Sequence, residues 1–187
     1  MKNFETNDCL VLNSIIYKIY TTNDFDEMRR QFLEQIKTVI DFDSADFYLV
    51  SAKEIERLER PVYFNCDEDL SDIYESIDYS RGIMFSGRSM VYRETDIISD
   101  EKRVNTEYYR RVYRPNNWHY AMQMIFGRNK SFLGVVTLYR TIGKEDFTYE
   151  DVFLMDMLKD HMAYRLYQER THQMTAQEKL TMTEAVR

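Results

Sequence analysis

Residues 120–139 read YAMQMIFGRNKSFLGVVTLY, and this stretch decides the fold. Its first half alternates with the period of two that is typical of a β-strand, one set of side chains being Tyr120, Met122, Met124 and Phe126. A polar turn follows at 128–131, and 132–139 is then a nearly continuous apolar run interrupted only by Gly134 and Thr137. The two strands are predicted to pair as an antiparallel hairpin at the centre of a sheet.

Two amphipathic helices are predicted before the first strand. The first has apolar residues at the i, i+3, i+4, i+7 spacing of one helix face, namely Leu12, Ile15, Ile16 and Ile19. The second begins after Asp24, which has the position of an N-cap with Glu27 three residues later. Its apolar stripe consists of Phe25, Met28, Phe32, Ile36, Val39 and Ile40.

Between these helices and the hairpin, strands and helices alternate. Short aromatic and β-branched runs predict strands over 45–50, 61–64 and 89–92, with Pro61 at the first position of its strand. Residues 51–59 are charged and predict a loop or one short helix. Helical spacing predicts helices over 70–77 and over 104–112, the second ended by Pro115. The order of elements predicts an α+β fold with helices packed on a mainly antiparallel sheet.

The last predicted helix begins at a capping box formed by Thr148 and Asp151 and continues to about Arg170. It is apolar around most of its circumference, whereas a helix that covers only a sheet needs one apolar stripe. Either the opening helices or a second subunit must therefore cover the remainder. We expect the terminal helices to form a dimer contact through Leu12, Ile16, Ile19, Met155, Met162 and Leu166.

Composition excludes several classes of protein. The chain has 187 residues, 44% hydrophobic and 30% charged, which is slightly more than one ordinary globular domain. It contains no apolar run long enough to span a membrane, no signal-peptide pattern at its start, and only Cys9 and Cys66 as cysteines. These features predict a cytoplasmic protein. The net charge of −7 indicates that this chain does not itself bind DNA.

Residues 132–151 resemble the C-terminal half of a GAF domain. That family has an aliphatic strand that contains glycine and ends in arginine, followed by an F-(S/T)-x-x-D motif that opens the last helix. Here Gly134 and Tyr139-Arg140 match the strand, and Phe147-Thr148-Tyr149-Glu150-Asp151 matches the helix start. The resemblance implies a GAF-like sensor domain over 24–170, with an additional helix at 1–23.

The end of the chain resembles a second family. Leu180-Thr181-Met182-Thr183-Glu184-Ala185 is similar to the entry of a LuxR-type helix-turn-helix, and Thr181 with Glu184 has capping-box spacing. We therefore expect 171–187 to be a polar linker followed by the start of a truncated DNA-binding domain. The alternative is a frayed end whose capping box arose by chance. The segment from Tyr92 to Asn116 also looks like the sensory half of such regulators.

Aromatic and charged residues between 92 and 119 form the candidate ligand site. Small-molecule sites combine an apolar lining with a few convergent polar groups. The residues that supply this mixture are Tyr92, Arg93, Glu94, Arg103, Tyr108, Tyr109, Trp118 and His119. The alternative is that these side chains pack around a collapsed pocket that binds no ligand.

Other chemistry is not indicated by the sequence. His119, His161 and His172 have no further histidine or cysteine at metal-ligand spacing, and no phosphate-binding glycine motif is present. We expect no metal and no cofactor. The two cysteines have no nearby residue that would activate a thiol.

The sequence thus predicts the non-enzymatic, ligand-sensing and dimerising regulatory domain of a bacterial-type transcription regulator. Its expected partners are an unknown small-molecule effector and a second copy of the chain, with DNA bound only through a C-terminal domain absent here. One alternative is a small-molecule enzyme on the same scaffold that uses Cys66 or His119. A purely dimerising or scaffolding role is another.

Overall fold

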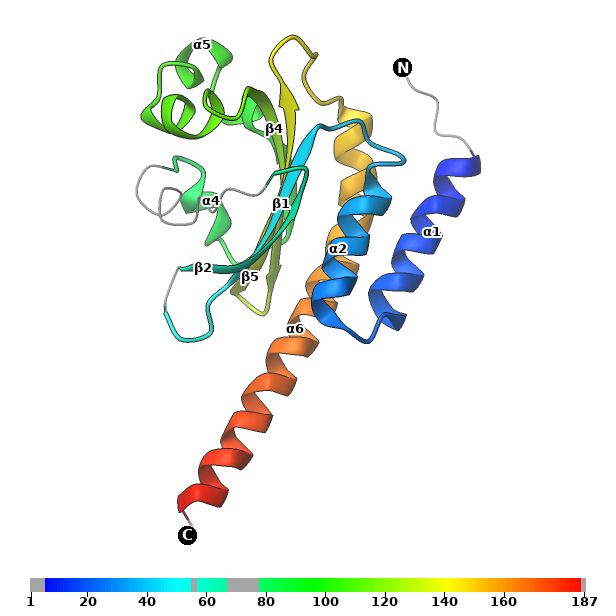
Figure 1. Cartoon of the computed structure of the whole chain (residues 1–187), viewed down its shortest axis with the longest axis vertical. Helices are drawn as coiled ribbons and strands as arrows, with labels where there is room; N and C mark the ends of the chain where they lie inside the picture. Colours follow the sequence, from blue (N-terminus) through cyan, green and yellow to red (C-terminus); the bar gives the residue numbers. More distant parts are fainter. Residues whose placement is uncertain (1–5, 55–56, 67–77, 186–187) are drawn as a thin grey trace.

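The computed structural model describes residues 6–54, 57–66 and 78–185, with side chains up to residue 176. A five-stranded sheet has a layer of helices on one face and short helical segments on the other (Figure 1). This arrangement confirms the predicted α+β class. The helix predicted over 70–77 lies outside the described residues, and no described helix is long and apolar enough to cross a membrane.

All neighbouring strands pair antiparallel, in the order β2-β1-β5-β4-β3. The strands are β1 (Ser44–Val50), β2 (Leu58–Phe64), β3 (Met90–Arg93), β4 (Trp118–Arg128) and β5 (Ser131–Thr141). The predicted hairpin is confirmed as β4 and β5. Its turn has positive φ at Asn129 (52°) and Lys130 (62°), the backbone pair whose twist matches that of the flanking strands.

The edge strand β2 begins three residues earlier than predicted, so Pro61 lies inside it and not at its first position. Arg60 has a positive φ of 51°, and the register with β1 shifts between Phe47 and Leu49. The irregularity lies at a sheet edge, where a proline without an N–H is tolerated.

Three long helices cover one face of the sheet. They are α1 (Thr6–Thr21), α2 (Phe25–Ile36) and α6 (Tyr149–Ala185). The N-cap of α2 is confirmed, because the Asp24 carboxylate accepts from the Glu27 N–H at 2.7 Å. The capping box of α6 is confirmed as well. The Thr148 hydroxyl accepts from the Asp151 N–H at 3.1 Å, and the Asp151 carboxylate accepts from the Thr148 N–H at 2.9 Å.

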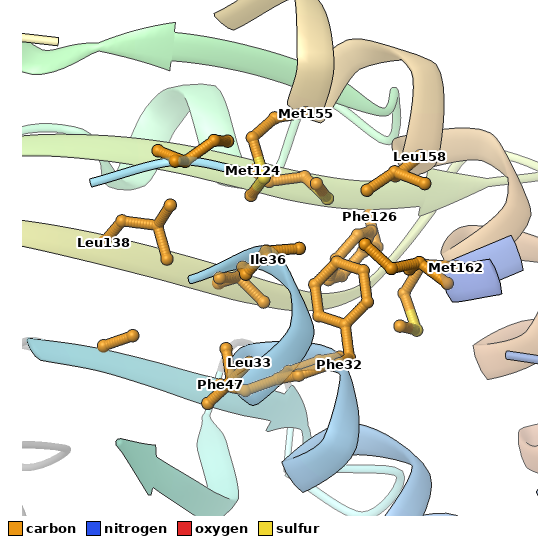
Figure 2. Close-up of a cluster of buried hydrophobic side chains, with 14 of the residues drawn as sticks. Phe32, Leu33, Ile36, Phe47, Met124, Phe126, Leu138, Met155, Leu158 and Met162 are labelled. Atoms are coloured by element: carbon orange, nitrogen blue, oxygen red, sulfur yellow. The ribbon is translucent and has the colours of Figure 1, made fainter. Parts of the chain in front are cut away.

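The main hydrophobic core lies between these helices and the sheet. Figure 2 shows side chains that meet there from α2, β1, β4, β5 and α6: Phe32, Leu33, Ile36, Phe47, Met124, Phe126, Leu138, Met155, Leu158 and Met162. The Phe47 ring lies 5.4 Å from that of Phe126 and 6.2 Å from that of Phe32. Burial of one such side chain contributes about 1.5–3 kcal/mol.

Most of the residues predicted for a dimer contact belong to this core of a single chain. Only Ile16 is half-buried, whereas the other five are buried: Leu12, Ile19, Met155, Met162 and Leu166. The reason is that α1 packs against both α2 and α6, so the opening helix covers much of the wide apolar surface of α6. A surface for a second subunit must therefore use other residues.

Helix α6 continues well beyond Arg170. The polar segment that was expected to be a linker is part of this helix and does not interrupt it. Residues 171–176 are exposed, yet no glycine or proline interrupts them. Their hydroxyls bond back along the helix, Thr171 to the Tyr167 carbonyl at 2.9 Å and Thr175 to the Thr171 carbonyl at 3.0 Å. Because the helix runs through residue 181, no separate helix begins at that position.

The helix predicted over 104–112 is divided into short segments. The structure has α5 (Asp100–Arg103) and a π-helical turn, η2 (Tyr109–Tyr113), separated by Thr106. The Thr106 hydroxyl donates to the Arg103 carbonyl at 2.7 Å and accepts from the Tyr109 N–H at 3.1 Å. These bonds replace the helical ones and separate the two segments.

Arg140 joins three segments beside the start of α6. Its guanidinium donates to the Asp41 carbonyl at 2.8 Å, to the Asp146 carbonyl at 2.7 Å and to the Asp151 carboxylate at 3.1 Å. It also lies 4.1 Å from the centroid of the Phe147 ring. The motif residue at the end of β5 therefore fixes the loop that leads into α6.

We expect Arg140→Met to lower the free energy of unfolding by about 3 kcal/mol, because it leaves the buried Asp151 carboxylate and several part-buried backbone carbonyls without a donor. Urea denaturation measures the change. The matched control is Arg110→Met, which removes an exposed arginine and should change stability by less than about 0.5 kcal/mol. Equal effects of the two substitutions would contradict the assignment.

Candidate functional site

The sheet face turned away from the helices carries aromatic and polar side chains. Alternation along β4 directs Met124 to the helix face and Ile125 to this second face. A bulge between Trp118 and Tyr120 also places Trp118 on the second face. The aromatic residues buried there are called the tyrosine cluster: Tyr48, Tyr92, Tyr108, Tyr109, Tyr113, Trp118 and Tyr139.

Seven of the eight residues predicted from the sequence lie in or beside this cluster. They are Tyr92, Glu94, Arg103, Tyr108, Tyr109, Trp118 and His119. Short elements deliver them: β3, the 3₁₀ turn η1 (Glu94–Asp96), α5, η2 and the start of β4, while α4 (Arg81–Met84) lies on the same side. Residues from several short elements between 92 and 119 are thus brought together on the second face of the sheet.

Arg93 is the exception and lies on the helix face. It follows Tyr92 on β3, so alternation points it to the opposite side. Its guanidinium donates to the Phe147 carbonyl at 3.0 Å, pairs with Asp96 at 2.6 Å and lies 4.1 Å from the Tyr149 ring centroid. The prediction that Arg93 belongs to the ligand site is therefore corrected. Arg93 holds the start of α6 and does not join the tyrosine cluster.

Glu94 and Arg103 form a buried ion pair at the centre of the site. Glu94 Oε2 lies 3.5 Å from Arg103 Nη1, and each side chain is 1% exposed. Arg103 also donates to Asp100 at 2.6 Å. Among the described residues, however, neither Glu94 oxygen has a hydrogen-bond partner, nor do Nε and Nη1 of Arg103. Buried charged groups with so few hydrogen bonds are unusual in a folded protein.

Burial changes the protonation of this site. It raises the pKa of Glu94 to about 7, although the Tyr113 hydroxyl and the Arg103 charge favour the ionised carboxylate. Burial also raises the pKa of Asp78. For Arg103, burial lowers the pKa, but Glu94, Tyr113 and Asp100 together raise it above its ordinary value. The site therefore holds a permanent cation beside a carboxyl group that titrates near neutral pH.

Two buried phenols add further polar atoms. The hydroxyls of Tyr79 and Tyr113 make no hydrogen bond of ordinary geometry within the described part of the chain, although both interact with the Glu94 carboxylate. Both rings pack edge-on against Tyr108, at centroid distances of 5.7 and 5.6 Å. Burial and the charge of Glu94 raise the pKa of both phenols, so both remain neutral and can donate or accept a hydrogen bond.

A second set of polar side chains is well bonded. The Ser80 N–H and hydroxyl donate to the Asp78 carboxylate at 2.7 and 2.6 Å. The side-chain oxygen of Gln123 lies 3.3 Å from the Ser80 hydroxyl and accepts from the Tyr92 hydroxyl. This chain of bonds ties β3 and β4 to the segment before α4.

Stacked aromatic rings form a flat surface beside the ion pair. Trp118 stacks on Tyr139 with 3.8 Å between centroids and 9° between planes. The Tyr139 hydroxyl donates to Asp46 at 2.7 Å, and the Tyr113 ring meets Tyr139 edge-on at 5.8 Å. The rings are thereby fixed in orientation. The site combines closely packed aromatic rings with a buried ion pair that has few hydrogen bonds.

Sequence reasoning missed Asp78, Ser80, Gln123 and Tyr113. Gln123 carries a usable signal, because it is the polar residue in an otherwise apolar alternating strand. Such a residue needs a buried polar partner. Tyr113 lies just after the helix predicted over 104–112, and its position in the cluster depends on the π-helical turn.

The residues of the alternative enzymatic hypothesis have other contacts. Cys66 Sγ donates to the Ala45 carbonyl at 3.3 Å. His119 Nδ1 lies 2.7 Å from the Tyr109 hydroxyl, and its Nε2 lies 3.5 Å from Asp100. Within the described ranges, no three His, Cys, Asp or Glu side chains are grouped so as to hold a metal ion.

Comparisons with solved structures identify a GAF-like fold. The chain is similar to the GAF domain of a phosphoenolpyruvate-protein phosphotransferase from Acinetobacter (TM-score 0.65, 9% identity, 90% of this chain and 97% of that chain). It is also similar to the chromophore-binding domain of the bacteriophytochrome RpBphP3 from R. palustris (0.65, 12%, 92% of this chain). The present chain spans 64% of that phytochrome chain.

A third similar structure is the LBD domain of VqsR from Pseudomonas aeruginosa (TM-score 0.57, 15% identity, 90% of this chain and 98% of that chain). No family model matches the sequence, and neither does any curated protein. At these identities the similarity shows the fold alone. The fold implied by the GAF resemblance is confirmed.

We expect Glu94→Gln to flatten the pH dependence of stability between about pH 4.5 and 7. The ordinary pKa of a glutamate is 4.5, and burial raises that of Glu94 to about 7. Below pH 4.5 the carboxyl is neutral in the folded and unfolded chain. Between pH 4.5 and 7 the unfolded chain ionises this carboxyl while the folded chain keeps it neutral, so stability falls as the pH rises to 7, by about 3 kcal/mol in total.

Urea midpoints at a series of pH values measure this effect. The difference between the original protein and Glu94→Gln isolates Glu94 from Asp78, which also titrates in the cluster. Glu101→Gln, at an exposed position on α5, is the control and should follow the original curve. Parallel curves for Glu94→Gln and the original protein would refute the role of Glu94.

Proposed function

We propose that this chain is a non-enzymatic sensor domain that binds a small molecule in the tyrosine cluster and belongs to a regulatory protein. The observation that carries the proposal is the Glu94–Arg103 pair, buried with unpartnered polar atoms. The GAF-like fold and the similarity to the VqsR LBD domain support it.

The physical argument rests on hydrogen bonding. A buried polar group without a partner costs about 1–3 kcal/mol, and more when it is charged. A ligand that offers donors to Glu94 and acceptors to Arg103, Tyr79 and Tyr113 would recover this free energy. The Trp118–Tyr139 stack offers a flat apolar surface to the rest of such a ligand. We infer an effector with both donors and acceptors on a planar or compact apolar body.

We further propose that the domain dimerises through exposed apolar residues of α1 and α6. On α6 these are separated by four, seven and ten positions, which places them at heptad positions of one coiled-coil seam with polar residues such as Asp160 and Thr171 between them: Phe153, Met157, Tyr164 and Met174. On α1, Tyr20 meets this seam, because its ring lies 6.3 Å from that of Tyr164 and its hydroxyl 3.0 Å from His161 Nδ1. Leu10 and Tyr17 are exposed on the same helix.

The exposed part of α6 supports a signalling role. An isolated helix is marginal in water, so the segment after Arg170 is expected to be stabilised by a second copy. Effector binding would then favour one arrangement of the paired helices over another. We propose that this change reaches a LuxR-type DNA-binding domain of a transcription regulator, as the resemblance of Leu180–Ala185 suggests.

Tyr113→Phe tests ligand binding directly. Its hydroxyl makes no hydrogen bond of ordinary geometry within the described residues, so we expect the variant to keep its stability within about 0.5 kcal/mol. Native mass spectrometry of protein purified from its host should show a retained small molecule on the original chain and a markedly lower occupancy on the variant. Tyr17→Phe, at an exposed position, is the control.

Absence of any added mass on the original chain would count against the proposal. A large loss of stability in Tyr113→Phe without a change in occupancy would assign the hydroxyl to folding.

Sedimentation tests the dimer. At tens of micromolar we expect the original chain to be dimeric and the double variant Phe153→Ser, Met157→Ser to be monomeric, because the substitutions remove exposed apolar surface from the seam. The control is Ile142→Ser, which removes an equally exposed apolar side chain after β5. A monomeric original chain would refute the proposed dimer and would leave the proposed ligand site unaffected.

A further inference from the structure

We propose that a groove beside Arg170 binds a small organic anion, with one carboxylate or phosphate group on an apolar body. We call it the exit groove, because it lies where α6 leaves the sheet. It is lined by the start of the β1–β2 loop (50–54), by Phe85, by the end of the β4–β5 turn (130–132) and by Arg170, with a volume of about 290 Å³. That is the size range of small-ligand sites.

The charge of the groove indicates an anion. Three cations line it, Lys53, Lys130 and Arg170, against a single carboxylate, Glu54. Glu54 is already engaged, because Arg57 Nη1 donates to both of its oxygens at 3.0 and 2.8 Å. None of the three cations forms an ion pair with a described residue. This local excess of positive charge occurs in a chain whose net charge is −7, and a bound anion would relieve the repulsion.

Aromatic and aliphatic side chains form the floor of the groove, whereas most of its exposed lining is polar. Phe85 and Phe132 meet edge-on with 4.9 Å between ring centroids, and Val50 lies beside them. Inorganic anions gain nothing from such a floor, whereas an anion with an aromatic or aliphatic body buries apolar surface on it. The groove therefore selects for an organic anion.

The backbone that carries the two lysines is fixed, and so is the Arg170 guanidinium. The Ser51 hydroxyl oxygen accepts from the N–H groups of Lys53 and Glu54, each at 3.2 Å, and so fixes the start of the β1–β2 loop. On the other side, Gly87 approaches the β4–β5 turn so closely that an added Cβ would lie 2.8 Å from the Lys130 backbone. Arg170 is anchored to the Phe132 carbonyl at 3.3 Å. Little ordering is then required when a ligand binds.

The position of the groove connects the sheet to α6. Arg170 is followed on α6 by the exposed residues 171–176, so an anion held by Lys130 and Arg170 would link the central hairpin to the base of the exposed segment. This site is separate from the tyrosine cluster and does not depend on a ligand there.

Titration of ¹⁵N-labelled protein with phenyl phosphate, inorganic phosphate and phenol tests the proposal. We expect phenyl phosphate to bind at least about tenfold more tightly than either of the others, since it alone uses both the cations and the aromatic floor. The shifted amide signals should be those of residues 51–54 and 130–132. Lys53→Ala and Lys130→Ala should each weaken binding severalfold, and the double variant by about tenfold or more.

Lys102→Ala, which removes an exposed lysine on α5, is the matched control and should leave the affinity unchanged. An equal loss in the control would mean that general attraction to the protein, and not the groove, accounts for binding. Equal affinity for inorganic and phenyl phosphate would overturn the organic anion. Failure of phenyl phosphate to shift the groove signals would overturn the site, while leaving the ligand site in the tyrosine cluster untouched.

Discussion

Burial of the β4–β5 hairpin on both faces is the constraint on which the rest of this structure depends. In the order β2-β1-β5-β4-β3, both hairpin strands have a neighbour on each side, so their backbone groups are paired and neither strand is an edge. Side chains on either face must then be covered. Met124 and Phe126 require the helices on one face, and Ile125 and Tyr139 require the short segments on the other.

The two faces meet this requirement with different chemistry. The helix face is a mainly apolar core, filled by side chains such as Phe47 and Met155, which fixes the fold. The second face buries Glu94 and Arg103, whose desolvation the apolar core must offset. Such a division is expected when a domain folds through one face and functions through the other.

Local signals explain what could be predicted from the sequence. The N-cap at Asp24, the capping box at Thr148 and the two-residue turn of the hairpin depend on residues within a few positions of one another. The burial of Met162 could not be predicted, because it depends on where α1 packs. The position at which α6 ends could not be predicted either, since the exposed polar segment after Arg170 lacks any residue that would stop a helix. Arg93, in contrast, could have been assigned to the helix face from its alternation with Tyr92.

Strand β4 is the physical route by which the second face can influence α6. It carries Trp118 and Gln123 on one face, whereas near its end Arg128 lies 4.9 Å from the Tyr164 ring centroid and 5.8 Å from that of Tyr167 on α6. Its paired neighbour β5 carries the Phe132 carbonyl that Arg170 binds. A shift of the hairpin of a few tenths of an ångström would therefore act on α6 at successive turns, just before its exposed segment begins. Because close-packed cores transmit small displacements instead of absorbing them, a change at the second face can reach α6 without a moving lid.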